Sequence, residues 1–293
     1  MITHMLDNFS EQVKDSLDLA KGKSFSGFDK IIVCGMGGSG IAGYIIKDIL
    51  DMPVIINQTP ELPKWVDNKT LAFIVSYSGN TMETLEMYKQ AAKKTKKLIA
   101  ITTGGILGKK AKESVIIPGG GLPKNNFHYL FFPMLNVLKN SNVLKFNVNE
   151  ILSAIKLVDK NFAKKLAGKL HGKTPLIYSS AGYYGTAVRW KQNFNETSKQ
   201  LAVANFYPEF FHNEIEGDFS KFGVIILEDK SEKRLDYFKK IVKCNVVKLK
   251  GSSKIAKSVY GIHTGDYTAY NLALLNKVDP DSEYRIDKLK ELS

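Results

Sequence analysis

A repeated order of short apolar runs, small-residue turns and helical patterns limits this chain most strongly to one class of fold. The clearest copy is the apolar run Lys30–Cys34, the turn Gly35-Met36-Gly37-Gly38-Ser39-Gly40 and a helical pattern through Leu50. Short buried strands that alternate with helices are typical of parallel sheets joined by right-handed crossovers. The sequence therefore predicts an α/β protein built from parallel sheets flanked by helices.

The same order continues and then restarts, which predicts two domains. Further strands are expected at Val54–Asn57, Leu71–Val75, Leu98–Thr102, Ser114–Ile117, Pro175–Ser179, Phe222–Leu227 and Cys244–Leu249. Helices are expected at Met82–Lys94, up to about Lys139, at Tyr183–Gln200 and at Ser231–Lys243. The polar segment 140–147 marks a boundary between an N-terminal domain of residues 1–140 and a C-terminal domain of residues 150–293.

Charge and composition narrow the function classes. The 293 residues include 42 Lys and Arg against 29 Asp and Glu, a formal charge of +13. The lysines are spread along the whole chain without a nucleic-acid-binding motif, so small anionic substrates are favoured over nucleic acid. No apolar stretch is long enough for a membrane span, the N-terminus is unlike a secretory signal, and Cys34 and Cys244 form no CxxC pair. We therefore expect a cytoplasmic protein with reduced thiols.

The spacing Gly35-x-Gly37-x-x-Gly40 matches a dinucleotide-binding fingerprint. That fingerprint needs an acidic residue at the end of the second strand, where Val54–Asn57 has none; the nearest, Glu61, lies beyond Pro60. A nicotinamide site is therefore disfavoured. A phosphate seat at the helix N-terminus and a ligand-free turn both remain open.

A second turn carries hydroxyl groups. Ser76, Ser78 and Thr81 surround Gly79 between an expected strand and an expected helix. Hydroxyls and free amides at a helix start can together satisfy the oxygens of a phosphate monoester. Helix capping would explain one of these hydroxyls but not three. The turn therefore favours phosphate binding, in a crevice shared with the glycine turn.

Two further residues stand out only in context. Glu196 could be an ordinary acid on a helix surface, and His212, in a polar and aromatic segment, could be an ordinary surface histidine. No histidine, cysteine or carboxylate spacing fits a metal site, so neither a metal nor a cofactor is expected.

Together these motifs resemble the bifunctional phosphoglucose/phosphomannose isomerases, a family built from two sugar isomerase (SIS) domains. The resemblance runs from about residue 30 to the C-terminus. It rests on the two turns, on Asn195-Glu196, on His212-Asn-Glu-Ile-Glu-Gly217 and on a tail that contains Ile286-Asp-Lys-Leu-Lys290. It implies interconversion of glucose 6-phosphate and mannose 6-phosphate with fructose 6-phosphate, without a metal and through a cis-enediol.

The resemblance also implies roles for individual residues. Glu196 would be the base that moves the proton between C2 and C1, and His212 and Lys290 would assist ring opening. His212 would come from the neighbouring subunit of a homodimer. Residues that would hold the substrate are Gly37, Gly38, Ser39, Ser76, Ser78 and Thr81.

One position departs from the family pattern, because Lys124 stands where an arginine is usual. A lysine supplies positive charge to an enediolate but lacks the planar fork of arginine.

Two alternatives remain: a SIS-type regulator that binds sugar phosphates without turnover, and a nucleotide-linked enzyme. A regulator needs neither Glu196 nor His212, and the missing strand-end acid counts against the nucleotide enzyme.

Overall fold

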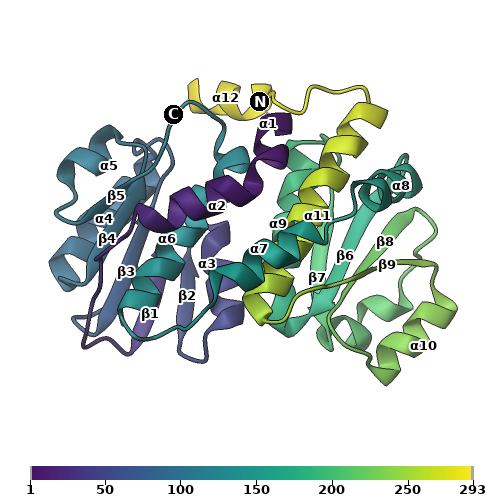
Figure 1. Cartoon of the computed structure of the whole chain (residues 1–293), viewed down its shortest axis with the longest axis horizontal. Helices are drawn as coiled ribbons and strands as arrows, with labels where there is room; N and C mark the ends of the chain where they lie inside the picture. Colours follow the sequence, from purple (N-terminus) through teal and green to yellow (C-terminus); the bar gives the residue numbers. More distant parts are fainter. Residues whose placement is uncertain (1, 292–293) are drawn as a thin grey trace. The chain divides into compact units, whose positions relative to one another are not determined.

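The computed structural model describes residues 2–291 and divides into two compact units (Figure 1). The N-terminal unit comprises Asp7–Asn149, and the C-terminal unit begins at Glu150 and includes the start of the chain through Leu6. Among the described residues, no helix is both long and apolar enough to cross a membrane.

A five-stranded parallel sheet forms the centre of the N-terminal unit. Its strand order is β2 (Val54–Asn57), β1 (Lys30–Cys34), β3 (Thr70–Val75), β4 (Leu98–Thr102) and β5 (Ser114–Ile116). Its helices are α2 (Phe9–Asp18), α3 (Ile41–Ile49), α4 (Met82–Lys94), α5 (Gly105–Lys110) and α6 (Phe127–Asn140). β1 and β3 are almost completely apolar because helices cover both faces of the sheet.

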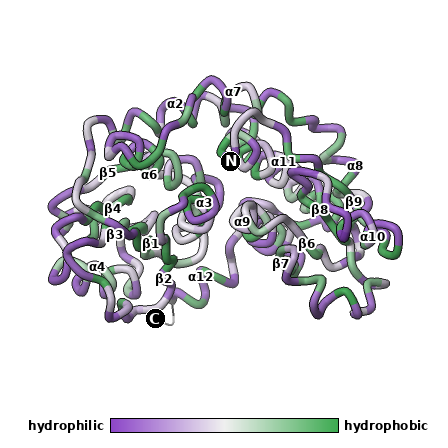
Figure 2. Tube along the Cα trace, turned by 90° about the horizontal axis from the view of Figure 1, so that it is seen from below, coloured by the Kyte–Doolittle hydropathy of each residue, from purple (hydrophilic) through white to green (hydrophobic). Residues whose placement is uncertain are grey.

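Alternate residues of each strand serve opposite faces of this sheet. Ile32 and Cys34 of β1 belong to a cluster that includes Met87 of α4 and Leu107 of α5. On the other face, a Cβ on Gly43 of α3 would lie 2.8 Å from Cβ of Val33, so glycine allows α3 to approach β1 closely. Figure 2 shows the hydrophobic residues along β1 and on α3.

The C-terminal unit contains a four-stranded parallel sheet. Its strand order is β7 (Val203–Tyr207), β6 (Thr174–Ser180), β8 (Phe222–Glu228) and β9 (Cys244–Lys248). The α-helices from α7 onward are α7 (Val148–Lys156), α8 (Lys160–Leu170), α9 (Tyr184–Glu196), α10 (Lys233–Ile241), α11 (Lys254–Leu275) and α12 (Tyr284–Glu291). The parallel α/β arrangement expected from the sequence is thus confirmed in both units.

The first residues of the chain pack with the C-terminal unit rather than with the N-terminal one. In α1 (Ile2–Asp7), the amide of Ile2 donates to the carboxylate of Asp281 at 3.1 Å. The hydroxyl of Tyr267 donates to the carbonyl of Leu6 at 3.1 Å. The expected boundary of 1–140 had placed these residues in the N-terminal domain, because contacts so distant in sequence leave no local pattern.

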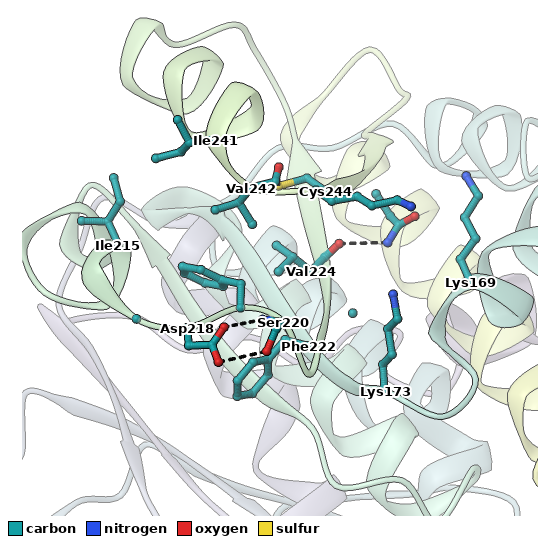
Figure 3. Close-up of a pocket in the computed structure, with 15 residues that line it drawn as sticks. Lys169, Lys173, Ile215, Asp218, Ser220, Phe222, Val224, Ile241, Val242 and Cys244 are labelled. Atoms are coloured by element: carbon teal, nitrogen blue, oxygen red, sulfur yellow. Dashed lines mark hydrogen bonds between the residues drawn. The ribbon is translucent and has the colours of Figure 1, made fainter.

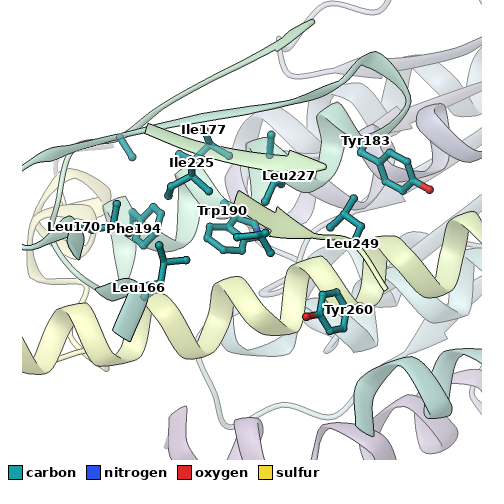
Figure 4. Close-up of a cluster of buried hydrophobic side chains, with 14 of the residues drawn as sticks. Leu166, Leu170, Ile177, Tyr183, Trp190, Phe194, Ile225, Leu227, Leu249 and Tyr260 are labelled. Carbon is teal, nitrogen blue, oxygen red and sulfur yellow. The ribbon is translucent and has the colours of Figure 1, made fainter. Parts of the chain in front are cut away.

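The larger core of the C-terminal unit lies between its sheet and helices α8, α9 and α11 (Figure 4). Trp190 and Phe194 of α9 are completely buried there, against Ile177, Ile225 and Leu227 of the sheet. The opposite face of the sheet packs against α10 and the segment 208–220, through Phe210 and Phe238.

Two glycines bring α11 close to α9. A Cβ on Gly265 would lie 2.6–2.8 Å from three atoms of the Trp190 indole, and a Cβ on Gly261 would lie 2.9 Å from Cγ2 of Thr186. The indole Nε1 of Trp190 also donates to the carbonyl of Gly261 at 2.8 Å. Glycine at these two positions therefore fixes the distance between the helices.

Two helix expectations needed correction. The pattern predicted a helix to Gln200, but α9 ends at Glu196, and Lys199 has a φ of +55° that no α-helix continues. The predicted helix Ser231–Lys243 is confirmed only over Lys233–Ile241. The 22-residue α11 was not predicted from the sequence, because it is buried on most of its circumference and so lacks a clear polar face.

We predict that Gly265→Ala lowers the free energy of unfolding by about 1–3 kcal/mol, because the added methyl overlaps a buried indole that has no room to move. Urea denaturation monitored by circular dichroism measures the change. Gly168→Ala in α8 is the matched control, because nothing lies within 4 Å of its Cβ position. The control should be neutral or stabilising by about 1 kcal/mol. Equal effects of the two substitutions would contradict this account.

Candidate active site

The glycine turn after β1 is shaped by its backbone. A Cβ on Gly35 would lie 2.7 Å from the carbonyl oxygen of Val75, and one on Gly40 would lie 2.5 Å from the carbonyl oxygen of Gly35. Gly37 has a φ of +49°, in the left-handed region. These positions require glycine because the backbone folds back on itself before α3 begins at Ile41.

The three hydroxyl groups of the loop between β3 and α4 have different surroundings. Ser76 is 1% exposed, and its Oγ lies 3.0 Å from Oγ1 of Thr81 and accepts a hydrogen bond from the amide of Gly79 at 3.1 Å. Ser78 is exposed, and its Oγ accepts from the amide of Asn80 at 3.2 Å. Thr81 is the N-cap residue of α4 but its side chain makes no capping bond. Its hydroxyl therefore turns toward Ser76 instead of closing the helix start.

These two loops meet at one point of the sheet. β1 and β3 are neighbours, and the chain runs from β1 outward to β2 before it returns to β3. Such a reversal of strand order opens a crevice at the carboxyl ends of the two strands. There the amide of Tyr77 donates to Oγ of Ser39 at 3.3 Å, which joins the glycine turn to the hydroxyl loop. The glycine turn and the hydroxyl loop therefore lie side by side at this end of the sheet.

A third loop completes this end of the sheet. The hydroxyl of Tyr77 accepts from the amide of Gly121 at 3.2 Å and from Nδ2 of Asn126 at 3.1 Å, and burial raises the pKa of this phenol. Lys124 lies between Gly121 and Asn126 in the sequence, and its side chain is buried, with 1% of the residue exposed. Its backbone amide would lie 3.8 Å from a Cβ on Gly38. The loop that contains Lys124 therefore borders the glycine turn.

In the C-terminal unit, Glu196 occupies the last turn of α9 and is half-buried. It lines a pocket of about 610 Å³ whose other walls are residues 199–201 and the tail from Val278 to Ile286. Lys199 bridges the two walls by donating to the carbonyls of Glu196 and Ser282. Arg285, which the sequence analysis did not single out, lines the same pocket. The sequence feature that could have drawn attention to Arg285 is that arginine is rare in this chain, with three in all.

The position of Glu196 depends on a buried ion pair one to two turns earlier in α9. A guanidinium nitrogen of Arg189 lies 3.3 Å from Asp266 of α11, and Nδ2 of Asn193 also donates to this carboxylate. Desolvation raises the pKa of Asp266, and the positive charge of Arg189 opposes that rise. Breaking such a pair leaves a buried charge without its counterion, so the pair holds α9 in register with α11.

His212 ends the short helical turn Glu209–His212 and is exposed. The segment beyond it is fixed to the sheet by Glu214, whose carboxylate accepts from the hydroxyl of Tyr178 at 2.6 Å and from Nδ2 of Asn205 at 2.5 Å. Tyr178 stacks on Phe210, with ring centroids 3.9 Å apart. Sequence reasoning missed Tyr178 because a tyrosine inside a strand gives no sign of its partner.

Lys290 lies on α12, where it is exposed and forms an ion pair with Asp287 at 3.3 Å. The pocket that contains Glu196 is lined by the preceding part of the tail and not by Lys290. The candidate residues thus form two groups. Those of the N-terminal unit are Gly37, Gly38, Ser39, Ser76, Ser78, Thr81 and Lys124, and those of the C-terminal unit are Glu196, His212 and Lys290.

The two cysteines have raised pKa values because they are buried or half-buried. Burial raises the pKa of Cys34 to about 12 and that of Cys244 to about 11. Both are free thiols, of which Cys34 is buried and Cys244 is half-buried. Within residues 2–291, no group of three or more His, Cys, Asp and Glu side chains is arranged to hold a metal ion.

Family models match a segment in each of the two units. A family model described as "SIS domain" matches residues 24–121, and one described as "Bacterial phospho-glucose isomerase C-terminal SIS domain" matches residues 159–292. A bifunctional phosphoglucose/phosphomannose isomerase of Thermoplasma volcanium is 36% identical, over 97% of this chain and 98% of its own length. That of Thermoplasma acidophilum is 35% identical, over 97% and 96%.

The chain belongs to the bifunctional phosphoglucose/phosphomannose isomerase family. A D-glucosamine-6-phosphate 4-epimerase of Sulfolobus acidocaldarius is also similar, at 32% identity over 77% of this chain and 78% of that protein. Among solved structures, the C-terminal domain of a glucosamine-fructose-6-phosphate aminotransferase from Francisella tularensis has a TM-score of 0.71 at 15% identity and covers 96% of each chain. That structural likeness supports the fold, which consists of two SIS domains.

We predict that Gly79→Ala disrupts the hydroxyl loop. Gly79 has a φ of +70°, and a Cβ there would lie 2.0 Å from the carbonyl oxygen of Gly104. The left-handed conformation alone costs about 1–2 kcal/mol in an L-residue, and the overlap adds to it. Gly22→Ala is the control, because Gly22 has a φ of +76° but nothing within 4 Å of its Cβ position. Urea denaturation should give a larger loss for Gly79→Ala; equal losses would refute the steric argument.

Proposed function

We propose that the chain is a metal-independent aldose–ketose isomerase that interconverts glucose 6-phosphate and mannose 6-phosphate with fructose 6-phosphate. The observation that carries the proposal is the hydroxyl loop Ser76–Thr81 at the switch point of the N-terminal sheet, joined to the glycine turn by the Tyr77–Ser39 hydrogen bond. Membership of the isomerase family supports the same reaction.

The phosphate group binds at the hydroxyl loop. Ser76, Ser78 and Thr81 offer hydroxyls beside the first amides of α4, which have no partners inside the helix. A helix N-terminus favours an anion by its dipole as well as by its free donors. Gly37, Gly38 and Ser39 line the sugar side of this site.

Glu196 acts as the base on the open-chain sugar. Its carboxylate removes the proton from C2 of the aldose, the C–H electron pair forms the C1–C2 double bond, and the carbonyl electrons move to O1. The product is a cis-enediolate, and the proton on O2 then moves to O1. The electrons on O2 form the C2 carbonyl while the C1–C2 double bond takes the proton back from Glu196 at C1, which gives the ketose. A positive side chain stabilises the developing oxyanion, and we assign this role to Lys124.

The mannose activity follows from the geometry of the intermediate. Carbon 2 is planar in the enediol, so it has lost its configuration. Rotation about the C2–C3 bond presents its opposite face to the same carboxylate. One base therefore serves glucose 6-phosphate, mannose 6-phosphate and fructose 6-phosphate.

Ring opening is assigned to His212, with Lys290 in the tail. His212 is exposed on its own unit, a requirement for a residue that reaches a neighbouring copy. We therefore propose a homodimer in which each active site receives His212 from the partner. This cytoplasmic enzyme requires no cofactor.

Two other activities are weighed against this one. A regulator that only binds sugar phosphates is not favoured, because the curated relatives are isomerases. The similar 4-epimerase acts, by its name, at C4 of glucosamine 6-phosphate. Its lower identity and coverage favour the isomerase for this chain, and both sugar phosphates belong in the decisive assay.

The decisive assay incubates the purified protein with fructose 6-phosphate in EDTA and quantifies glucose 6-phosphate and mannose 6-phosphate. A parallel reaction with glucosamine 6-phosphate is analysed for the C4 epimer. Both aldose phosphates should form from fructose 6-phosphate above a protein-free control. Absence of both products would overturn the proposal, and epimer formation alone would replace it with the 4-epimerase activity.

We predict that Ser78→Ala and Thr81→Ala raise KM more than they lower kcat. The phosphate is bound equally in the ground and transition states, so these hydroxyls contribute uniform binding energy. Steady-state kinetics with fructose 6-phosphate measure both constants, and Ser220→Ala, at an exposed serine of the other unit, is the control. An unchanged KM in both single variants and in the double variant would reject the phosphate site.

We predict that Glu196→Gln lowers the rate of every interconversion at least about 100-fold, because a positioned general base contributes about 10²–10⁴-fold. Solvent deuterium exchange into fructose 6-phosphate reports proton transfer directly. Glu209→Gln, a change of the same kind at an exposed acid, is the control. Near wild-type exchange in Glu196→Gln would assign the base to another residue. Glu214 is then disfavoured because Tyr178 and Asn205 already occupy its carboxylate.

We predict that Glu196→Gln and His212→Ala complement each other when mixed. In a homodimer with shared sites, half of the dimers at equal mixing are mixed, and each of these has one intact site. About a quarter of wild-type activity should therefore return. Activity is measured after co-refolding, and sedimentation velocity checks the dimer. A fully active monomer, or no recovery in verified mixed dimers, would refute the shared site.

A further inference from the structure

The C-terminal unit contains a second pocket, of about 710 Å³, that the proposed reaction does not use. It lies at the amino ends of three neighbouring strands, where β6, β8 and β9 begin at Thr174, Phe222 and Cys244. It shares no lining residue with the pocket of Glu196. Its volume is within the range of about 300–1,000 Å³ usual for small-molecule sites.

Positive charge dominates the rim of this pocket. Lys169, Lys173 and Lys243 line it, and among the described residues none of their ammonium groups has an ion-pair partner. The acid in the lining is Asp218, whose carboxylate accepts from the amide and the hydroxyl of Ser220 at 2.8 and 2.9 Å. These hydrogen bonds lower the pKa of Asp218, so it is ionised and already engaged. Three lysines against one aspartate leave a formal charge of +2 for an anion to neutralise.

The floor of the pocket is apolar. Phe219, Phe222 and Val242 are partly buried side chains at the edge of the core cluster around Phe210 and Phe238. The Phe219 ring packs edge-on against that of Phe238, with centroids 5.4 Å apart, which holds it in place. In Figure 3, Lys169 and Lys173 lie on one side of the pocket and Ile215 and Asp218 on the other. The pocket thus combines cations on one wall with apolar surface beside them.

We propose that this pocket is a regulatory site for a nucleoside phosphate, a ligand that joins an anionic phosphate chain to a flat aromatic ring. The lysines pair with the phosphate oxygens as flexible point charges, and the ring lies on the apolar floor formed by Phe219, Phe222 and Val242. A sugar phosphate alone would leave that floor exposed to water.

The regulatory part of this inference rests on the proposed function, through the segment that carries His212. The pocket wall from Ile215 to Ser220 begins three residues beyond His212. Glu214 joins this wall to the sheet through Tyr178 and Asn205, so a ligand on the wall constrains the same segment. The effect of the ligand on substrate affinity and the effect of the substrate on ligand affinity are then required to be equal in binding free energy.

Binding is tested first, and it needs no turnover. Isothermal titration calorimetry with ATP is carried out on the full-length protein and three variants. Lys169→Gln/Lys173→Gln/Lys243→Gln should weaken binding at least about tenfold, because three charge-assisted contacts are lost. Lys164→Gln/Lys165→Gln, at exposed positions of the same helix α8, controls for general charge, and Ser78→Ala/Thr81→Ala controls for binding at the phosphate loop. Both controls should keep the wild-type affinity.

A second measurement uses the unmodified protein. Cys244 lines the pocket, so bound ATP should slow its alkylation by N-ethylmaleimide at least about fivefold at pH 9, mapped by mass spectrometry. The elevated pKa of about 11 makes the reaction slow, and raising the pH increases the thiolate fraction tenfold per unit. Cys34 is completely buried and should stay unmodified, which checks that the protein remains folded during the reaction.

The outcomes separate the parts of the proposal. Loss of ATP affinity in the Ser78→Ala/Thr81→Ala variant, or no protection of Cys244, would overturn the site. Equal affinity for inorganic triphosphate would overturn the role of the ring. If ATP binds but leaves both kcat and KM for fructose 6-phosphate unchanged in an active enzyme, the regulatory role is overturned. An inactive enzyme that still binds ATP would instead count against the proposed function.

Discussion

The contact between α9 and α11 is the constraint on which the C-terminal unit depends. A buried ion pair between Arg189 and Asp266 and the indole of Trp190 against Gly265 fix the register of the two helices. The two helices cannot easily shift along each other, because a buried charge needs its counterion beside it. The close packing at Gly265 likewise leaves no space for even one added methyl group. Glu196 is the last residue of α9, so the contact between α9 and α11 also fixes the position of its backbone.

The N-terminal unit uses backbone geometry where the C-terminal unit uses side chains. Several glycines in its loops pack so closely against backbone carbonyl oxygens that a side chain at these positions would overlap them. The hydrogen bond from the amide of Tyr77 to Oγ of Ser39 joins two loops that lie far apart in sequence. A phosphate bound there would meet donors already in place, which is the arrangement that minimises the cost of ordering a site.

The residues proposed for phosphate binding and for proton transfer thus lie on separate elements of the chain. This separation offers a physical reason why this chain is similar both to isomerases and to a protein named as a 4-epimerase. A common phosphate anchor can serve several sugar phosphates, while the reacting carbon is chosen by the groups around the base. The same separation leaves the amino edge of the C-terminal sheet, with its lysines and aromatic floor, available for a ligand other than the substrate.

Local sequence determined the glycine turn, the hydroxyl loop and the described strands other than β7, because each depends on neighbours within a few residues. β7 (Val203–Tyr207) was not expected from the sequence. β1, β2 and β4 were predicted with their observed bounds, since a short apolar run ended by a turn has few alternatives. The family could also be inferred from the motifs, whereas the individual catalytic roles remain predictions. Only the tertiary structure decided the Arg189–Asp266 pair, the Tyr178–Glu214 contact, the end of α9 and the grouping of residues 2–6 with the C-terminal unit. These features join residues up to 279 positions apart, as in the Ile2–Asp281 hydrogen bond, and such partners are chosen by packing rather than by any local pattern.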